Sequence, residues 1–358
     1  MNDLLRKLPL LQLDGVVPGT ERAMSAYNAM GVTTVYEGHA MDLPHIDVYR
    51  WLRKHGRLTV RVLCAPEAEP YGLPWTDEPL KLHDYLRRLE LARDMVDRSN
   101  DFFRIDGVTI GRGGPCWPGF TLMREPYLGP YGEKTTGRSF VSLEKIQAAI
   151  GFCRDHDIRL NIATAGLAEN DDYLDRLEAL APALAEADGR AWLLQHLFFA
   201  DREQVRRVAA LGLDVTTSMS FSWGKGEFVR ERLGEQFLPD FIPIARLLEH
   251  GLHIGCGTDW GPKNIFEQIA LAVQPHYAAS GRGAATAGVS RQHALAMWTR
   301  EAAHVLRWDG IGSLEPGHHA DLVVVDRDPL TCPIEDLPST RVISTMLGGQ
   351  LVSGEALW

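Results

Sequence analysis

The sequence predicts an α/β fold, a TIM-type (β/α) barrel followed by a small β unit. Three observations support this prediction. Short β-branched runs alternate with helical stretches over most of the 358 residues. No glycine-rich phosphate loop of the kind that marks a dinucleotide-binding sheet is present. After Pro316, strand-like runs follow one another without helices between them.

Seven segments are predicted to be parallel strands, because each is short, apolar and rich in β-branched residues. They are 32–36, 58–63, 107–110, 159–162, 192–194, 213–216 and 253–256. A complete barrel of this type has eight strands. The sequence therefore predicts a barrel that is incomplete by one strand.

Helices are predicted between most of these strands, at 19–30, 82–96, 142–156, 171–187 and 201–211. Ser142 and Asp201 are typical N-cap residues, and Gly31 and Gly212 are typical stops. The segment 111–136 is a long loop rich in Gly, Pro and aromatic residues. It follows the end of a strand, so we expect it to border the active-site face, with a simple surface insertion as the alternative.

The C-terminal part has a different pattern. Strands are predicted at 320–326, 341–346 and 348–352, and the last two are joined by a Gly348-Gly349 turn. Three such strands bury too little surface to be stable alone, so they must pack on another part of the molecule. We place the boundary between the barrel, residues 1–315, and the β unit, residues 316–358.

Charge and cysteine content limit the function. The net charge of −10 argues against nucleic acid as a partner and against docking on an anionic membrane. The five cysteines are scattered, with no paired spacing, which is typical of reduced thiols in a cytoplasmic protein. The N-terminus indicates no signal peptide, and no apolar stretch is long enough for a membrane span.

Several motifs are very specific. Gly257-Thr258-Asp259-Trp260 follows the last predicted strand, and TREAAHVL at 299–306 is followed by IGSLEPGHHADLVV at 311–324. These motifs resemble the amidohydrolase superfamily. The segments 14–20 and 31–34 resemble its amidohydrolase 3 branch. The resemblance runs from about residue 8 to residue 352, and it implies that the β unit is a remnant of a composite β-sandwich.

The resemblance implies hydrolysis of a small amide, ester or cyclic C–N substrate by a metal-activated water. Asp259 matches the acidic residue at the end of the last barrel strand, and His196 matches the histidine at the end of strand six. Other positions depart from the family. No His-x-His occurs in the chain, which begins after the point where that motif should lie, and Thr109 and Ala163 stand where relatives have the bridging lysine and a histidine. The resemblance therefore predicts a reduced or relocated metal site.

We predict Asp259 and His196 as catalytic residues, and the same two with Glu37 and His39 as ligands of a divalent metal. Glu-x-His places both side chains on one face of an extended segment, and this donor set suits zinc or iron. The alternatives are a salt-bridged loop at Glu37 and His39, and a site without metal. For Asp259 the alternative is a helix cap or loop closure, and for His196 a buried core histidine. Arg112, Trp223, Lys225 and Trp260 follow strand ends and could line a pocket. Of these, Arg112, Trp223 and Trp260 are predicted to bind substrate, with a purely structural role as the alternative for each. His318 and His319 lie in a turn and are predicted to be structural.

Three functions are compatible with these features. The first is a hydrolase of the amidohydrolase type with a small-molecule substrate. The second is a non-catalytic subunit that pairs with a chain supplying the His-x-His strand and the rest of the sandwich. The third is a metal-free hydrolase or lyase that uses Asp259 and His196 as an acid–base pair. We expect a homo-oligomer or a complex with a complementing chain, and the missing strand could come from residues 8–13 or from a second chain.

Overall fold

The computed structural model describes residues 13–39, 41–70, 78–114, 119–180, 192–259, 261 and 263–356. Its parallel strands lie in two sheets. The first sheet is β1 (Thr34–Glu37), β2 (Arg61–Cys64) and β3 (Phe103–Ile105). The second, in spatial order, is β10 (Ile254–Cys256), β9 (Asp214–Thr217), β8 (Leu193–His196), β7 (Leu160–Thr164) and β4 (Val108–Gly111).

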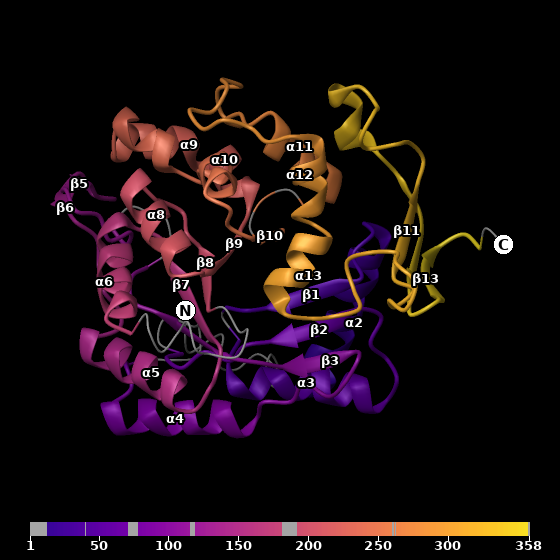
Figure 1. Cartoon of the computed structure of the whole chain (residues 1–358), viewed down its shortest axis with the longest axis horizontal. Helices are drawn as coiled ribbons and strands as arrows, with labels where there is room; N and C mark the ends of the chain where they lie inside the picture. The colour runs from indigo at the N-terminus through magenta and orange to yellow at the C-terminus, as the bar shows by residue number, and fades with distance from the viewer. Residues whose placement is uncertain are drawn as a thin grey trace.

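Helices surround these sheets (Figure 1). They are α2 (Leu13–Ala29), α3 (Leu43–Lys54), α4 (Leu82–Asp94), α5 (Leu143–Asp155), α6 (Leu167–Glu178), α8 (Arg202–Ala210), α9 (Met219–Arg232), α10 (Ile244–Glu249), α11 (Ile265–Val273), α12 (Arg291–Ala296) and α13 (Arg300–Leu306), with 3-10 helices η2 (Glu235–Asp240) and η3 (Ile334–Ser339). The two predicted N-caps are confirmed. The Ser142 and Asp201 side chains accept hydrogen bonds from backbone N–H groups three residues later.

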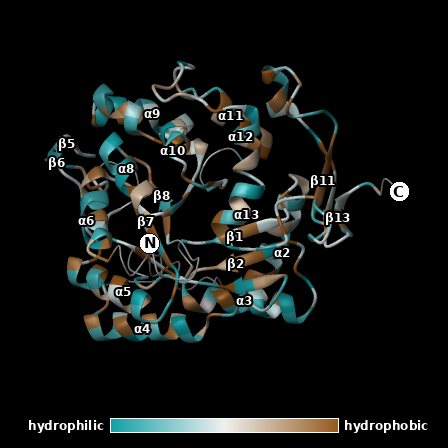
Figure 2. Ribbon diagram, viewed as in Figure 1, coloured by the Kyte–Doolittle hydropathy of each residue, from teal (hydrophilic) through white to brown (hydrophobic). Residues whose placement is uncertain are grey.

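One parallel bridge, between Glu67 and Thr109, connects the two sheets. Through it the seven predicted strands follow one another as β1, β2, β4, β7, β8, β9 and β10. Along α4, α5 and α6 hydrophobic residues alternate with hydrophilic ones (Figure 2), as expected for helices that bury one side on a sheet. This architecture agrees with the predicted α/β barrel type.

Helix α13 lies on the open side of this strand series, between β10 and β1 (Figure 1). A Cβ atom added to Gly255 of β10 would lie 3.4 Å from the Cα of Ala302. On the other side, Leu306 shares a hydrophobic cluster with Leu63 of β2 and Tyr36 of β1. Helix α13 therefore packs on this side, where no described strand pairs with β1 or β10. The proposed replacement strand, residues 8–13, lies outside the described part except for Leu13 at the start of α2.

The C-terminal strands β11 (Leu322–Val325), β12 (Val342–Leu347) and β13 (Gln350–Gly354) form an antiparallel sheet. Gly348 and Gly349 have positive φ angles of 56° and 80°, so the predicted glycine turn is confirmed. Within the predicted loop 111–136, a two-stranded hairpin is formed by β5 (Tyr127–Leu128) and β6 (Lys134–Thr135). No described helix combines the length and the apolar character needed to cross a bilayer.

Candidate functional site

Three of the predicted site residues converge at the carboxyl ends of the strands. His39 follows β1, His196 ends β8, and Asp259 follows β10. The imidazole rings of His39 and His196 are edge to face, with centroids 5.5 Å apart. The Nδ1 of His196 lies 3.4 Å from Oδ2 of Asp259. This is the end of a parallel barrel at which catalytic groups are found.

Glu67 is a fourth member of this group, which the sequence analysis did not identify. Its Oε1 is hydrogen-bonded to Nδ1 of His39, and its side chain is only 6% exposed. The residue lies three positions beyond the end of β2. A carboxylate just after a buried strand is the signal that could have identified it, because loops at strand ends build sites in barrels.

The two imidazoles lie in opposite electrostatic environments. Burial lowers the pKa of His196 well below its usual value, and the positive charges of His39 and Lys225 lower it further. The ring of His196 stacks on Phe198 at 4.8 Å. Desolvation also lowers the pKa of His39, but the charge and hydrogen bond of Glu67, with the charge of Asp259, outweigh it and raise the pKa overall. A neutral His196 therefore lies beside a His39 that holds its proton more readily.

Glu37 is not brought into this group. Its Oε1 accepts a hydrogen bond of 2.5 Å from the Tyr49 hydroxyl of α3, and burial raises the pKa of its carboxyl. The expectation that Glu37 and His39 share one face differs from the structure. The reason is that β1 ends at Glu37 and the chain bends at His39, so the alternation of an extended strand no longer relates them.

The predicted substrate-binding residues have different surroundings. Arg112 follows β4 and forms an ion pair with Asp172 of α6. Trp223 is half-buried in α9, and its carbonyl accepts a hydrogen bond of 2.7 Å from the N–H of Ala278. Trp260 lies outside the described residues. Their predicted role in substrate binding stays a prediction.

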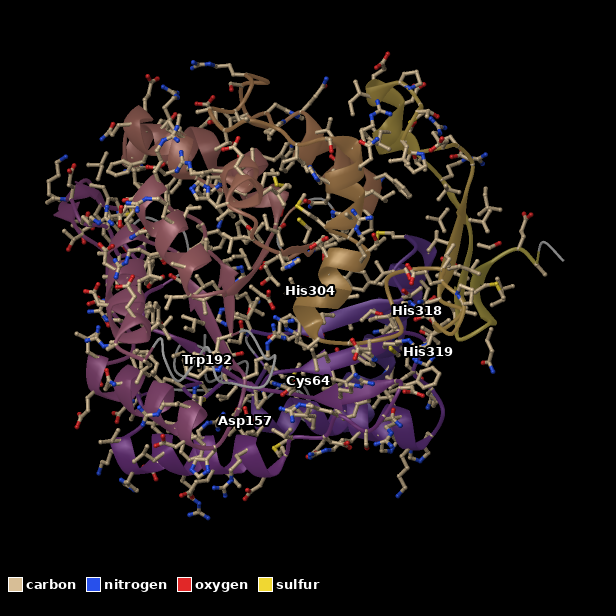
Figure 3. The ribbon with its side chains drawn as sticks, in the orientation of Figure 1. Cys64, Asp157, Trp192, His304, His318 and His319 are labelled. Atoms are coloured by element: carbon tan, nitrogen blue, oxygen red, sulfur yellow. The ribbon has the colours of Figure 1, made fainter. Side chains whose placement is uncertain are left out.

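The His318-His319 pair lies beside the C-terminal sheet (Figure 3). The Nδ1 of His318 is 2.9 Å from the Ser313 hydroxyl, and Nε2 of His319 is 3.9 Å from Asp101. Both contacts hold the turn that enters the sheet. They agree with the predicted structural role.

His39, Glu67, His196 and Asp259 are called the site group. Their two imidazoles and two carboxylates are donors of the type that zinc and iron accept. In the part of the chain that the structure describes, however, no three His, Cys, Asp or Glu side chains are arranged to hold one metal ion. As they stand, these residues do not fit a metal site.

Comparison with known proteins identifies the family and several relatives. A family model described as "Amidohydrolase family" matches residues 2–353. The N-substituted formamide deformylase of Arthrobacter pascens is 29% identical over 219 residues, 60% of this chain and 40% of that protein. The 5-methylthioadenosine/S-adenosylhomocysteine deaminase of Thermoanaerobacter pseudethanolicus is 37% identical over 94 residues, 25% of this chain and 21% of that protein. The chain thus spans less than half the length of these relatives.

Solved structures of the same fold are also similar. An uncharacterized metal-dependent hydrolase from Pyrococcus horikoshii has a TM-score of 0.72 at 19% identity, over 90% of this chain and 62% of that one. Atrazine chlorohydrolase from Arthrobacter aurescens, complexed with zinc, has a TM-score of 0.60 at 19% identity, over 98% of this chain and 76% of that one. At such identities the likeness establishes the fold, and the predicted TIM-barrel type is confirmed.

Proposed function

The chain belongs to the amidohydrolase family, and from this premise we propose that it is a hydrolase of a small amide, ester or cyclic C–N substrate. The names of its relatives, a formamide deformylase and a deaminase, support a non-peptide carbon–nitrogen bond. The observation that carries the proposal is the convergence of His39, Glu67, His196 and Asp259 at the carboxyl ends of the strands.

The proposal includes a divalent metal, zinc or iron, only if further ligands come from outside the described residues. Its chemistry would be to lower the pKa of a bound water and to polarise the scissile group. The site group alone does not fit such an ion. The proposed proton transfers therefore involve only side chains of this chain.

Asp259 is the proposed general base. Its side chain is 40% exposed, so a water molecule can reach its carboxylate, and Nδ1 of the neutral His196 lies 3.4 Å from the same carboxylate. As the water oxygen attacks the carbonyl carbon, its proton passes to Asp259. A bond forms between water oxygen and carbon, and the carbonyl becomes a tetrahedral oxyanion.

His39 is the proposed general acid. Its Nδ1 is held by Glu67, which leaves Nε2 to face the substrate, and its side chain is 47% exposed. The imidazolium stabilises the oxyanion and donates a proton to the leaving nitrogen when the C–N bond breaks. The raised pKa of His39 favours the protonated form that a general acid needs.

An activity screen with matched variants tests this proposal. Formamides, acylated amines, aminopurines and cyclic amides are incubated with the protein, and release of amine, ammonia or acid is measured. The variant Asp259→Asn should lose about 10²- to 10⁴-fold in kcat, the usual contribution of a general base. Asp47→Asn, at an exposed residue of α3, should keep the activity. Equal activities of the two variants would remove Asp259 from the mechanism.

Metal analysis decides the cofactor. The protein is purified without chelator, its zinc and iron content is measured, and activity is assayed before and after dialysis against EDTA. Stoichiometric metal with loss of activity supports the metal-dependent form. Metal-free protein whose activity survives EDTA supports the reaction with Asp259 and His39 alone.

A complementing subunit is the second candidate. It is favoured by the topology, because within the described residues β1 and β10 each pair with a strand on one side only. Helix α13 packs on that side, so a partner, or a second copy of this chain, would have to displace it to add a strand, and would bring further donors to the site. Light scattering after size-exclusion chromatography tests it, since a stable monomer with hydrolase activity would argue against an obligatory partner.

The proposed compartment is the cytoplasm. All four cysteines that the structure describes, Cys64, Cys153, Cys256 and Cys332, are free thiols. Free thiols are usual in a reducing compartment.

A further inference from the structure

We infer that Asn161 is a positioning residue, which fixes His39 and His196 relative to each other. The inference deepens the proposed function, and rests on it for its effect on catalysis. Asn161 is the second residue of β7 and is only 1% exposed. Its hydrogen bonds in the described structure go not to the two histidines but to the residue before each of them and to Thr109.

The Asn161 amide bridges two strand ends. Its Nδ2 donates to the carbonyl of Gly38, the residue before His39. The same nitrogen lies 2.7 Å from Oε1 of Gln195, the residue before His196. One side chain therefore connects the β1 end of the site to the β8 end, although β1 and β8 are not neighbours in either sheet.

Thr109 of β4 completes this buried layer. Its hydroxyl lies 2.8 Å from Nδ2 of Asn161 and donates to the Gly38 carbonyl at 2.6 Å. Nδ2 of Asn161 thus has three oxygen acceptors and only two hydrogens, so one hydrogen is shared. The Gly38 carbonyl is held by two donors from two different strands.

The chemistry of this layer requires a donor at position 161. The oxygens of Gly38 and Gln195 both accept hydrogen bonds from Asn161. In the described structure the Asn161 amide is the group that connects them. A carboxylate of the same shape has no hydrogen to give and would place negative charge against these oxygens. Asn161→Asp should therefore move Gly38 and Gln195 apart, with almost no change in side-chain volume at position 161.

Asn28 provides a matched control. It is also fully buried, and its Nδ2 donates to the carbonyls of Val32 and Thr59 at 3.0 and 2.8 Å. Like Asn161, it leaves its Oδ1 without a partner in the described structure. It lies in α2, and none of its contacts involves a residue next to His39 or His196. Asn28→Asp therefore reproduces the loss of stability without disturbing the site.

The experiment compares the ring ¹⁵N signals of the histidines by NMR in the full-length protein, assigned with His39→Gln and His196→Gln. These signals report tautomer and hydrogen bonding directly, and they need no substrate. We expect the signals of both His39 and His196 to move in Asn161→Asp and to stay in place in Asn28→Asp. Unmoved signals in Asn161→Asp, or equal movements in the two variants, would overturn the inference.

A milder variant keeps the test decisive if Asn161→Asp does not fold. Gln195→Met removes only the acceptor on the β8 side, while Asn161 keeps Gly38 and Thr109. We expect the His196 signal to move more than the His39 signal. The reverse order, or no movement, would contradict the bridge.

Kinetics separate this inference from the proposed function. With an active substrate, Asn161→Asp should lower kcat by about tenfold to 10²-fold, because a misplacement of about 1 Å at catalytic groups has effects of this size. KM should change less than kcat, and Asn28→Asp should retain kcat. If the wild-type protein hydrolyses nothing, the proposed function fails, while the ¹⁵N signals still decide the role of Asn161.

Discussion

His196 and Asp259 both have a left-handed backbone conformation, with φ angles of 73° and 35°. Residues other than glycine seldom adopt it, and each such residue costs about 1 to 3 kcal/mol unless its surroundings impose it. At His196 the ring lies against Phe198 and Phe221, and the backbone carbonyl accepts a hydrogen bond of 2.9 Å from the Thr217 hydroxyl, so both side chain and backbone are held. The proposed base and the imidazole beside it therefore both lie on strained backbone, as do Asp157, Ile242 and Arg307 outside the site.

The hydrogen bond between Glu67 and His39 predicts a pH effect. The Glu67 carboxylate raises the pKa of His39, so Glu67→Gln should lower that pKa. Since the proposed acid must be protonated, activity should be lost at a lower pH in this variant than in the wild type. The measurement is kcat as a function of pH.

Glu37→Gln is the control for this pH profile. Glu37 is half-buried and faces Tyr49. It should alter stability without moving the alkaline limb of the profile. A limb that moves equally in both variants would show that His39 is not the acid.

The sequence predicted three of the four site residues. Asp259 and His196 were identified by their resemblance to a family motif, and His39 by its place after a strand. Glu67 was missed because its role depends on a contact over 28 positions between two loops, which no local pattern records. Glu37 was included because it shares a motif with His39, whereas the bend after β1 directs it to α3.

The strands were predictable because their apolar, β-branched runs are local signals, and all seven lie within a few residues of the observed positions. Helix α9 was not predicted, because its sequence includes Gly224 and Gly226 and has no apolar stripe. A Cβ atom at Gly226 would lie 2.1 Å from the Tyr277 ring, so packing requires this glycine. The position of α13 on the open side depends on tertiary contacts with Gly255 and Leu63, which the sequence alone does not encode as a pattern.

The first turn of α6 predicts a dependence of stability on pH. Glu169 is 1% exposed and accepts hydrogen bonds from the N–H groups of Ala165 and Gly166. Burial raises its pKa from 4.5 to about 7, although these hydrogen bonds lower it. The folded state therefore binds the proton more tightly than the unfolded state. This contribution to stability is present below about pH 4 and is lost as the pH rises through about 7.

Glu169→Gln should remove this dependence. Between pH 5 and pH 8 the wild type should lose on the order of 2 to 3 kcal/mol of unfolding free energy relative to the variant. Urea unfolding at the two pH values measures the difference. Glu231→Gln, at an exposed residue of α9, should follow the wild type. Parallel curves for wild type and Glu169→Gln would show that the carboxyl does not titrate in this range.

The C-terminal sheet and the barrel share buried polar contacts across the predicted boundary at residues 315 and 316. The Thr345 hydroxyl of β12 donates to the Asn28 carbonyl of α2 at 2.7 Å. Arg61 of β2 reaches Asp321 just before β11. These contacts lie between residues more than 250 positions apart in the chain. We therefore expect the two parts to unfold together, even though their strand patterns differ.

The Arg61–Asp321 pair is the strongest of these contacts. Nε and Nη2 of Arg61 donate to the two carboxylate oxygens at 2.6 and 2.8 Å, and the side chains are 1% and 5% exposed. Arg61→Met would leave the buried carboxylate without its positively charged partner and with only the N–H of Gly348 as a hydrogen-bond donor in the described structure, which should cost about 3 to 5 kcal/mol in the free energy of unfolding. The double variant Arg61→Met with Asp321→Leu removes both charges and should recover much of that loss.

Urea unfolding of the single and double variants, with hydrogen exchange of β11 to β13, measures this coupling. Arg50→Met, at a residue 43% exposed on α3, is the control and should change stability by no more than about 0.5 kcal/mol. In Arg61→Met the C-terminal sheet should exchange faster, because the pair attaches it to β2. If the double variant instead loses the sum of the two single losses, the two residues act independently, and the attachment of the sheet depends on its apolar contacts alone.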